Sequence, residues 1–418
     1  MSHQEFKVVV IGAGAAGIGA ARRLRDAGVA TLLVEARPRL GGRAWTVPGP
    51  AGPMDIGCGW LHSADRNPWA PIAEAQGLTV DRTPPPWGRA SSLVGLGARD
   101  GAEFGAALQN FRREVDAAAE AATDRAADSL LRPGDHWNHL IDAVSTWYSG
   151  VELDRVSVRD LARYDDSGVN WRVVEGYGTA IAKHAAGADV QLDCVVQRID
   201  RRGRQLRLET TCGVITADAA IVTLPSNVLA ETPELFLPAL PDKTEAASGL
   251  PLGLANKLYL SLSGADEFEK ESRAFGASDR TRTGVYHFRP FGRPMIEAFF
   301  GGDLAAELEK GGKEAFFDFA VAEFVSLFGG DFARRVKPLR AHGWRGDPFA
   351  RGSYSCALPG RADCRAVLAA PVENRLFFAG EACSTTDFST AHGAYQTGLD
   401  AADQAIAAIR ASTPARAE

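Results

Sequence analysis

The sequence predicts an α/β protein of two domains, one with a Rossmann-like parallel sheet and the other an α+β domain with a mixed sheet. Three observations lead to this prediction. A strand, a glycine-rich turn, a helix and a second strand follow one another up to Glu35. Strand-like and helix-like segments then alternate along the rest of the chain. Finally, 418 residues are more than one ordinary core accommodates, so at least two domains are expected.

The N-terminal segments form a recognisable unit. Lys7–Ile11 (KVVVI) is an apolar run typical of a buried parallel strand, and a helical stretch follows to about Ala27. A second apolar strand, Ala30–Val34, ends at Glu35. The turn Gly12–Gly17 (GAGAAG) is a G-x-G-x-x-G motif with an acidic residue about twenty positions later. This combination predicts a dinucleotide-binding unit.

Each part of the motif has a physical role. Gly12 permits the tight turn, Gly14 lets the backbone approach a pyrophosphate, and Gly17 lets the helix pack on the strand. The N-terminus of the helix offers free N–H groups and the positive end of its dipole to phosphates. Glu35 is placed to accept a hydrogen bond from a ribose hydroxyl. This unit alone leaves both NAD and FAD open.

The remaining segments extend the same architecture. From about Arg82 to Gly150 the pattern indicates amphipathic helices, whose default role is to cover a sheet. Strand patterns follow at 190–199, 205–210, 219–224, 254–260 and 375–379, and helical patterns at about 305–309, 314–328 and 393–409. Because the strand near residue 376 should complete the first sheet, the first domain must be assembled from separated segments.

Composition excludes several classes of protein. Lys and Arg number 46 against 52 Asp and Glu, and a net charge of -6 gives no support for nucleic-acid binding. No stretch approaches the ~18 apolar residues that span a bilayer, and the N-terminus lacks a secretory signal pattern. The six cysteines are scattered, without a CxxC pair or a Cys/His cluster. We therefore expect a cytoplasmic protein with no metal site, no nucleic-acid partner and no membrane partner.

The segment after Glu35 distinguishes the cofactors. Residues 35–46 (EARPRLGGRAWT) resemble the second glycine motif of FAD-containing oxidases such as flavin amine oxidases, phytoene desaturases and protoporphyrinogen oxidases. There the Gly-Gly turn and its arginine lie against the ribose and pyrophosphate of the cofactor, which implies FAD contacts for Gly42 and Arg43. Residues 55–62 (DIGCGWLH) look like the next segment that approaches FAD in the same oxidases.

Two C-terminal segments narrow the family. Leu376–Glu381 (LFFAGE) and Thr390–Tyr395 (TAHGAY) are similar to the C-terminal FAD motif of flavin amine oxidases. In that family the acid contacts the ribityl-pyrophosphate region, and the helix N-terminus faces the pyrimidine end of the flavin. A positive dipole end there would stabilise the negative charge of reduced flavin. The resemblance implies these roles for Glu381 and for Thr390 with Ala391.

Two further matches concern the substrate side. Gly253–Leu258 (GLANKL) matches the family's strand with the lysine that holds a water against flavin N5. Trp344 and Ala350–Ser355 (ARGSYS) resemble the active-site tyrosine segment of polyamine oxidases and lysine-specific histone demethylases. The resemblance to flavin amine oxidases runs from Val8 to about Ala408.

The family resemblance implies a glutathione-reductase-type FAD-binding domain and a substrate-binding domain. The segments expected in the FAD-binding domain are 1–80, 177–230 and 338–418, and those expected in the substrate-binding domain are 81–176 and 231–337. The candidate cofactor-binding residues are Gly12, Gly14, Ala15, Ala16, Gly17, Glu35, Ala36, Arg37, Gly42, Arg43, Gly59, Trp60, Val196, Trp344, Gly380, Glu381, Thr390 and Ala391.

The implied reaction is FAD-dependent amine oxidation. A hydride passes from the carbon next to the amine nitrogen to flavin N5, the imine hydrolyses to an aldehyde or ketone, and O2 reoxidises the flavin to give H2O2. Lys257, one of only eight lysines, lies in an apolar strand pattern and would orient the water at N5; the alternative is an edge-strand lysine that reaches solvent. His62 is either a residue that faces the substrate or a structural histidine.

Tyr354 would form one wall of an aromatic cage for the amine, and its alternative is an ordinary core tyrosine. Thr390 takes the opposing position, where monoamine oxidases place a second tyrosine, so the cage is half open and polyamine-like or bulky amines are favoured. Covalent flavin in the family needs a cysteine just before the cage tyrosine. Ser353 stands there, so we expect non-covalent FAD.

Four other functions are weighed against an amine oxidase. An L-amino-acid oxidase, or an amine dehydrogenase that uses another electron acceptor, stays open because many arginines could receive a carboxylate. A non-enzymatic flavin-binding interaction protein is disfavoured, because Lys257, Tyr354 and Glu381 are all present. A carotenoid desaturase is disfavoured by the lack of an apolar membrane-facing stretch. Oligomeric state is open, with a homodimer among the expectations.

Overall fold

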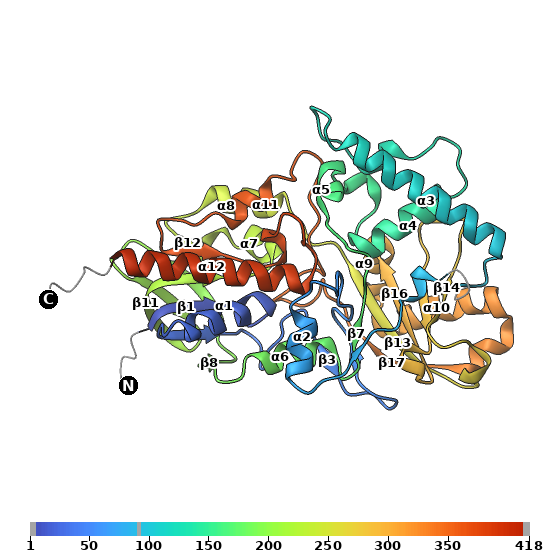
Figure 1. Ribbon diagram of the computed structural model, residues 1–418, viewed down its shortest axis with the longest axis horizontal. Helices are drawn as coiled ribbons and strands as arrows, with labels where there is room; N and C mark the ends of the chain where they lie inside the picture. The colour runs from blue at the N-terminus through green and yellow to red at the C-terminus, as the bar shows by residue number, and fades with distance from the viewer. Residues whose placement is uncertain (1–5, 90–92, 413–418) are drawn as a thin grey trace.

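Two lobes, each built around a β-sheet, make up the protein (Figure 1). The computed structural model describes residues 6–89 and 93–412. Both ends of the described chain belong to the lobe on the left of Figure 1, and the middle of the chain forms most of the lobe on the right. The predicted α/β class is confirmed.

The first sheet has eight strands among the described residues. Its order is β12 (Phe236–Leu237), β9 (Val196–Asp200), β10 (Leu206–Thr210), β11 (Gly213–Val222), β1 (Phe6–Ile11), β2 (Thr31–Val34) and β8 (Val190–Gln191), with β18 (Leu376–Phe378) on the far half of β11. β1 is parallel to both β2 and β11, and β18 is parallel to β11. Strands from both ends of the chain therefore share one sheet.

Helices cover both faces of this sheet because its central strands are apolar on both sides. In β1, Val8 and Val10 pack on one face and Val9 and Ile11 on the other, all fully buried or nearly so. On the first face lie α1 (Ala15–Asp26), α2 (Trp69–Ala75), α6 (Tyr177–His184) and α12 (Ala391–Ser412). On the second face lie α7 (Ser226–Glu231), α8 (Pro241–Ser248) and α11 (Cys364–Ala369).

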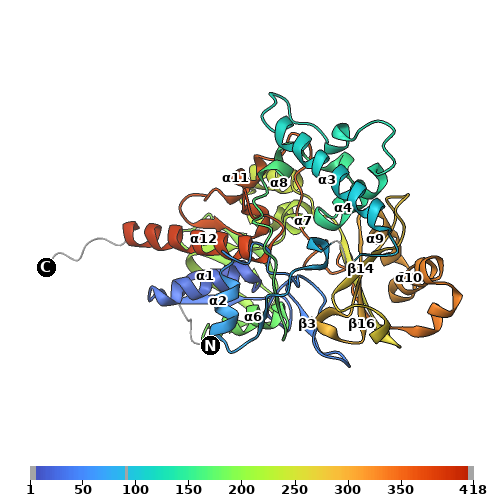
Figure 2. The ribbon, with the colours of Figure 1, turned by 45° about the vertical axis from the view of Figure 1, so that its right-hand side comes forward.

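The helices α1 and α12 lie side by side, although they come from opposite ends of the chain (Figures 1 and 2). Glycines allow this close approach, because a Cβ at Gly398 would lie 2.1 Å from the Ala16 carbonyl oxygen. On the outer side, Arg23 pairs with Asp403 at 2.6 Å. The C-terminal helix is thereby fixed against the helix of the glycine motif.

The second sheet has six strands among the described residues, in the order β17 (Val336–Ala341), β13 (Ala255–Leu262), β16 (Met295–Gly301), β15 (Val285–Phe288), β14 (Ser272–Phe275) and β6 (Leu93–Val94). Its pairs are antiparallel except for β14 with β6, so the sheet is mixed, as predicted. The helices of this lobe are α3 (Ala98–Ala118), α4 (Asn138–Tyr148), α5 (Val158–Arg163), α9 (Gly302–Lys310) and α10 (Gly312–Phe328).

Short two-stranded sheets lie between the lobes. They pair β3 (Thr46–Val47) with β4 (Met54–Asp55), and β5 (Val80–Asp81) with β7 (Arg172–Val173). Through β4 the chain brings Asp55 to within hydrogen-bonding distance of β13, since the Lys257 ammonium donates to the Asp55 carbonyl at 2.9 Å.

Two of the differences between the structure and the sequence-based expectations concern the first sheet. The run 190–199 is two strands rather than one, because Asp193 has φ +54 and turns the chain between β8 and β9. Residues 236–250 pack with the first sheet through β12 and α8, whereas the expected boundaries put 231–337 in the substrate-binding domain. Leu235 to Leu250 carry an apolar surface that fits the second face of that sheet.

Candidate active site

The glycine turn after β1 has the close packing that the motif requires. Gly12 has φ +101, and a Cβ at Gly17 would lie 1.8 Å from the Gly12 carbonyl oxygen. Gly14 is different, because the nearest atom to a Cβ there is the Gly42 Cα at 4.0 Å. Gly42, with φ +57, belongs to the second glycine turn. The two turns therefore pack closely, since a Cβ at Gly42 would lie 3.1 Å from the Gly14 Cα.

The N-terminus of α1 lies beside the second glycine turn. The helix begins at Ala15, and its N-cap residue Gly14 has no side chain to satisfy the first N–H groups, which include those of Ala15 and Ala16. Free N–H groups at a helix start, with glycine backbone opposite, form a cradle for an anion. A bound pyrophosphate fits this donor set.

Glu35 ends β2 beside the cradle and is 4% exposed. One carboxylate oxygen accepts from the Ala13 amide at 2.7 Å and the other from the Arg37 amide at 2.9 Å. Half-buried Ala36 lies between Glu35 and Arg37 in the chain. The Arg37 guanidinium pairs with Asp347 at 2.5 Å. Glu35 is therefore held rigidly, at the edge where a ribose would lie.

The segment before β9 runs along the same edge. The Cys194 amide donates to the Glu35 carbonyl at 2.9 Å, and the Asp193 amide to the Arg37 carbonyl at 3.2 Å. Val196, the first residue of β9, follows directly and is partly buried. Three predicted cofactor-binding residues, Glu35, Arg37 and Val196, thus lie close together.

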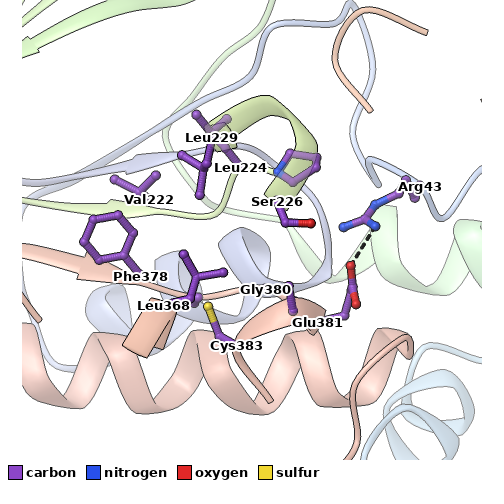
Figure 3. A pocket seen from close by; sticks show the side chains of 13 residues that line it. Arg43, Val222, Leu224, Ser226, Leu229, Leu368, Phe378, Gly380, Glu381 and Cys383 are labelled. Atoms are coloured by element: carbon purple, nitrogen blue, oxygen red, sulfur yellow. Dashed lines mark hydrogen bonds and ion pairs between the residues drawn. The ribbon is translucent and has the colours of Figure 1, made fainter. Parts of the chain in front are cut away.

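Partly buried Arg43 and buried Glu381 form an ion pair at 2.8 Å, shown by the dashed line in Figure 3. Glu381 also accepts from the Ser355 hydroxyl at 2.6 Å and from the Ser389 amide at 3.0 Å. Burial raises the pKa of Glu381, but the charge of Arg43 and these hydrogen bonds outweigh it and hold the pKa below its ordinary value. The pair is therefore ionised and fixed.

Figure 3 shows the pocket that this pair borders. It lies at the carboxyl ends of β11 and β18, where Val222 and Phe378 contribute apolar walls. Gly380 has φ +138, and no atom lies within 4 Å of the position a Cβ would take. The carboxyl edge of a parallel sheet is where ligands bind in this class of fold, so the pocket belongs to the candidate site.

Lys257 lies in β13 of the second sheet and is 5% exposed. Its ammonium group pairs with a carboxylate oxygen of Glu297 at 2.8 Å and donates to the Asp55 carbonyl at 2.9 Å. Burial raises the pKa of Glu297, and the Lys257 charge lowers it to below its ordinary value. The alternative of an edge-strand lysine that reaches solvent is wrong, because β13 lies between β16 and β17.

Gly59 leaves room beside this ammonium group. A Cβ at Gly59 would lie 3.2 Å from the Lys257 Nζ. The next residue, Trp60, turns its ring toward the second lobe, where it stacks on His287 at 6.2 Å and contacts Trp87 at 4.5 Å between ring centroids. The Trp60 ring therefore contacts residues of the second lobe.

A cavity is lined by Gly59, Trp60 and Glu297, the partner of Lys257, and we name it the aromatic cavity. Its principal lining residues are Asp55, Trp60, Arg172, Tyr259, Phe291 and Glu297. The Arg172 guanidinium lies between two rings, 4.6 Å from Trp60 and 3.9 Å from Phe291. Arg172 also pairs with Glu271 at 2.5 Å. Burial raises the pKa of Glu271, but His287 and Arg172 outweigh this effect and lower the pKa to about 2. The cavity wall is aromatic with compensated charges.

Tyr354 is partly buried, and its hydroxyl donates to the Trp147 carbonyl at the end of α4. Burial raises the pKa of the Tyr354 phenol, which stays protonated. The Ser353 hydroxyl donates to the Ala255 carbonyl at 3.1 Å and accepts from the Ala255 amide at 2.9 Å. Both bonds tie this hydroxyl to the first residue of β13. The tyrosine ring is thus anchored at both its backbone and its hydroxyl end.

Thr390 caps the C-terminal helix. Its hydroxyl donates to the Asp387 carbonyl at 2.6 Å and accepts from the Gly393 amide at 3.0 Å. Ala391 begins α12, and its carbonyl accepts from the indole of Trp69 at 3.3 Å. The sequence pattern placed Thr390 opposite Tyr354; the structure adds the capping role, which the spacing Thr390-x-x-Gly393 could have indicated.

His62 lies near this helix start. Its Nδ1 contacts the Asn170 Oδ1 at 2.6 Å, and the Asn170 amide group donates to the Gly168 carbonyl at 3.0 Å. The second bond fixes which end of Asn170 faces the ring, so Nδ1 carries the proton and Nε2 is the acceptor. Burial lowers the pKa of His62 below its ordinary value. The histidine is neutral near pH 7.

Trp344 is 2% exposed and packs against Gly57, where a Cβ would lie 3.4 Å from the indole. It belongs to the core of the second lobe, next to the chain that leads to Gly59. Sequence reasoning missed Glu297 and Asp55, the two partners of Lys257. The signal for Glu297 was available, because it is a lone acid in the apolar run MIEAFFG.

Comparison with known proteins identifies the family. The model of the family "Flavin containing amine oxidoreductase" matches residues 15–94 and 91–406. The chain is 30% identical to Polyamine oxidase 4 of Oryza sativa subsp. japonica, over 95% of this chain and 88% of that protein. It is 30% identical to Polyamine oxidase 2 of Arabidopsis thaliana, over 96% of this chain and 88% of that protein.

More distant similarities agree. The chain is 25% identical to Lysine-specific histone demethylase 1 homolog 3 of Arabidopsis thaliana, over 99% of this chain but 31% of that larger protein. A solved structure of a putrescine oxidase variant with redesigned cofactor binding has a TM-score of 0.79 at 18% identity, covering 96% of this chain and 99% of that chain, which shows a shared fold. Across residues 6–89 and 93–412, no helix is both long and apolar enough to cross a membrane.

The resemblance predicted from the sequence is thereby confirmed, and the chain is an oxidoreductase. It belongs to the flavin-containing amine oxidoreductases.

Proposed function

We propose that this protein is an FAD-dependent amine oxidase that acts on a polyamine-like or bulky amine and uses O2 as electron acceptor. The observation that carries the proposal is the buried Lys257 ammonium, held by Glu297 and the Asp55 carbonyl where the two lobes meet. Bound FAD would supply the electron-accepting chemistry, with N5 as the acceptor of a hydride from the carbon next to the amine nitrogen. Water could then hydrolyse the imine product to an aldehyde or ketone, and O2 could reoxidise the cofactor with release of H2O2.

The first lobe would hold the cofactor without a covalent bond. The N–H groups at the start of α1, beside Gly14, fit the pyrophosphate, and Glu35 fits the ribose next to them. Arg43, paired with Glu381, provides a positive charge near the phosphates. Ser353 supports non-covalent binding, because a hydroxyl bonded to Ala255 stands where a thiol would be needed.

Lys257 would hold a water at the reacting face. An ammonium group has three N–H donors, and within the described part of the chain two of them reach Asp55 and Glu297. In this proposal the third donor binds the water. Gly59 lies beside the ammonium group, where a Cβ would come within 3.2 Å of the Lys257 Nζ. The ion pair with Glu297 compensates the charge of the buried ammonium group. Lys257 thus orients the water that hydrolysis needs.

Tyr354 and His62 would position the amine. The hydrogen bond from Tyr354 to Trp147 fixes the tyrosine ring, which can serve as one wall against the aliphatic chain next to the nitrogen. Neutral His62 presents an acceptor at Nε2, suited to an N–H group of the amine. Burial in such a site favours the neutral amine, which is the form that can release a hydride.

The substrate class is argued from the relatives and from Thr390. The most similar curated relatives reported above are named polyamine oxidases. Thr390 is smaller than a tyrosine, so the site is open on the side facing Tyr354. An amino acid is the second candidate, because Arg172 and Arg293 line the aromatic cavity and could receive a carboxylate.

The test is anaerobic bleaching of the bound flavin by a panel of polyamines, aryl-alkylamines, cyclic amines and amino acids. Bleaching by polyamines or bulky amines, followed by rapid recovery of the yellow colour and H2O2 formation on admission of air, is the expected result. Bleaching by amino acids alone would assign an amino-acid oxidase. Bleaching without recovery in air would assign a dehydrogenase, and a flavin that no compound bleaches would overturn the enzymatic proposal.

A further inference from the structure

Cys194, just before β9, and Cys212, in the turn between β10 and β11, form a pair of neighbouring residues at one end of the first sheet, outside the proposed active site. β9 and β10 are antiparallel, and Thr210 of β10 pairs with Val196 of β9. Beyond this pair the chain of β10 turns at Thr211 and Cys212. The Cys212 sulfur lies 3.5 Å from the carbonyl oxygen of Asp193, the residue next to Cys194, so the two cysteines are neighbours. A disulfide bridges Cα atoms about 4.4–6.8 Å apart.

Hydrogen bonds hold the register beyond the ends of the strands. The Thr211 amide donates to the Val195 carbonyl at 3.0 Å, and the Val195 amide donates to the Thr211 hydroxyl at 2.9 Å. The Thr210 hydroxyl accepts from the Cys194 thiol at 3.4 Å and from the Cys212 amide at 3.0 Å. One hydroxyl oxygen therefore contacts both cysteines.

The two thiols differ in their surroundings. Cys212 is exposed, in the tight turn between β10 and β11, and its sulfur lies 3.5 Å from the Asp193 carbonyl. Cys194 is 1% exposed. Burial raises the pKa of the Cys194 thiol, the bond to Thr210 lowers it, and the neighbouring Cys212 thiol raises it. An oxidant in solution therefore meets Cys212 first, with Cys194 as its neighbour inside the protein.

We propose that Cys194 and Cys212 are a modification site that forms a reversible disulfide with hydrogen peroxide. The Cys212 thiolate attacks one peroxide oxygen and becomes a sulfenic acid, while the other oxygen leaves as hydroxide and takes up a proton to form water. The Cys194 sulfur then displaces the hydroxyl group from the Cys212 sulfur, which forms the S–S bond and releases a second water. The two thiols lose two electrons, and these reduce one peroxide to two waters.

The disulfide would act on the cofactor site. The Cys194 amide is bonded to the Glu35 carbonyl and the Asp193 amide to the Arg37 carbonyl. A crosslink therefore fastens the β10–β11 turn to the segment that supports the proposed ribose contact. We expect the oxidised protein to release FAD several-fold more slowly than the reduced protein. The peroxide source rests on the proposed oxidase function, but added peroxide makes the test independent of it.

The test uses the full-length holoenzyme, reduced and then treated with a few equivalents of H2O2, alkylated with N-ethylmaleimide and digested with trypsin. Arginines separate the two cysteines, so Cys194 lies in peptide 184–198 and Cys212 in peptide 208–243. A mass equal to the sum of these peptides less two hydrogens, which disappears after reduction, is the expected product. FAD release is measured on the same samples by flavin fluorescence.

Three variants serve as controls. Cys212→Ser should give no linked peptide, and Cys194→Ser should leave a Cys212 sulfenic acid that dimedone labels. Cys364→Ser, which alters a partly buried thiol on α11, should form the link as the unmodified chain does. Direct conversion of Cys212 to sulfinic acid in the unmodified chain, without the linked peptide, would overturn the proposal. A link with unchanged FAD release would overturn the effect on the cofactor site.

Discussion

At the scale of single residues, charge compensation determines what the proposed site can do. Buried Lys257 pairs with Glu297, and partly buried Arg43 pairs with buried Glu381. Removing one member of such a pair leaves a buried charge without its partner, which costs about 3–5 kcal/mol. A variant at these positions therefore tests stability and chemistry together, and its design has to separate the two effects.

Lys257→Met should slow flavin reduction by the amine, flavin reoxidation by O2, or both, by about 10²-fold, because one preorganised donor is lost. Stopped-flow absorbance measures the two rates separately. The double variant Lys257→Met with Glu297→Gln removes the uncompensated charge and should recover stability without recovering the rates. Lys183→Met, on the exposed side of α6, is the matched control. If both rates stay unchanged in a folded Lys257→Met protein, the proposed role of Lys257 is wrong.

His62 should remain neutral across the working range of pH, because burial lowers its pKa below the ordinary value of 6.5. A lowered pKa in the folded state stabilises the protein above pH 6.5, and that stabilisation is lost as the pH falls toward the lowered value. His62→Asn should reduce kcat/KM by about 2- to 10-fold, the worth of one neutral hydrogen bond.

The pH profile provides the check on His62. The pH profile of kcat/KM between pH 6 and 9 should show the same ionisations in the unmodified protein and in His62→Asn. His139→Asn, at an exposed position on α4, controls for the loss of a histidine. An ionisation near 6.5 present in the unmodified protein and absent from His62→Asn would contradict the neutral assignment.

At the scale of secondary-structure elements, the glycines of the first turn divide into two kinds. A Cβ at Gly17 would overlap the Gly12 carbonyl at 1.8 Å, whereas a Cβ at Gly14 would meet only the Gly42 Cα at 4.0 Å. Gly17→Ala should therefore destabilise the protein with or without FAD. Gly14→Ala should leave the apoprotein stable but weaken FAD binding by tenfold or more, because the methyl group occupies the proposed pyrophosphate space.

Thermal unfolding of the apoprotein and a flavin titration measure these two effects separately. Gly28→Ala, at a position with open space around it but φ +72, is a control for replacing a turn glycine. Equal losses of apoprotein stability in Gly14→Ala and Gly17→Ala would show that the space at Gly14 is part of the protein's own packing rather than a ligand site.

The helices α5 and α11 are joined by two ion pairs of contrasting burial. Arg365, fully buried, binds Asp160 through two contacts of 2.6 and 2.8 Å, while Arg163 and Asp363 pair at 2.8 Å on the surface. Arg365→Met should cost about 3–5 kcal/mol by leaving Asp160 unpaired. Arg163→Ala, which breaks the surface pair of the same helices, should cost less than about 1 kcal/mol.

Urea unfolding measures both free energies. The double variant Arg365→Met with Asp160→Leu removes the buried charge altogether and should recover much of the lost stability. Similar losses in Arg365→Met and Arg163→Ala would show that the buried pair has no special weight in joining the helices.

At the scale of the whole molecule, the sequence predicts the fold well where signals are local. The strands and helix around Gly12–Gly17 are placed to within one or two residues, because periodicity and turn glycines are read over short windows. The Asp160–Arg365 pair could not be predicted, since its members lie 205 positions apart and nothing local marks them. The same holds for Cys194 and Cys212, whose register depends on the turn at Asp193.

The interleaved lobes also make a prediction about the cofactor as a stabilising ligand. FAD would contact Glu35, Arg43 and Glu381, which belong to segments from both ends of the chain. A ligand that binds only the folded state stabilises it by about 2.7 kcal/mol at a hundredfold excess over Kd, so added FAD should raise the Tm of the apoprotein by a few degrees. Arg43→Ala should reduce this shift, because the charge near the phosphates is lost.

The same preparation tests whether FAD is held without a covalent bond. Ser353 offers a hydroxyl engaged with Ala255 where a covalent link would need a thiol, so unfolding in guanidinium chloride should release all of the flavin. Ultrafiltration of the unfolded protein measures this directly: the yellow colour should pass through the membrane with the small molecules. Colour that stays with the unfolded chain, together with a protein mass increased by that of FAD, would contradict non-covalent binding and require another residue as the point of attachment.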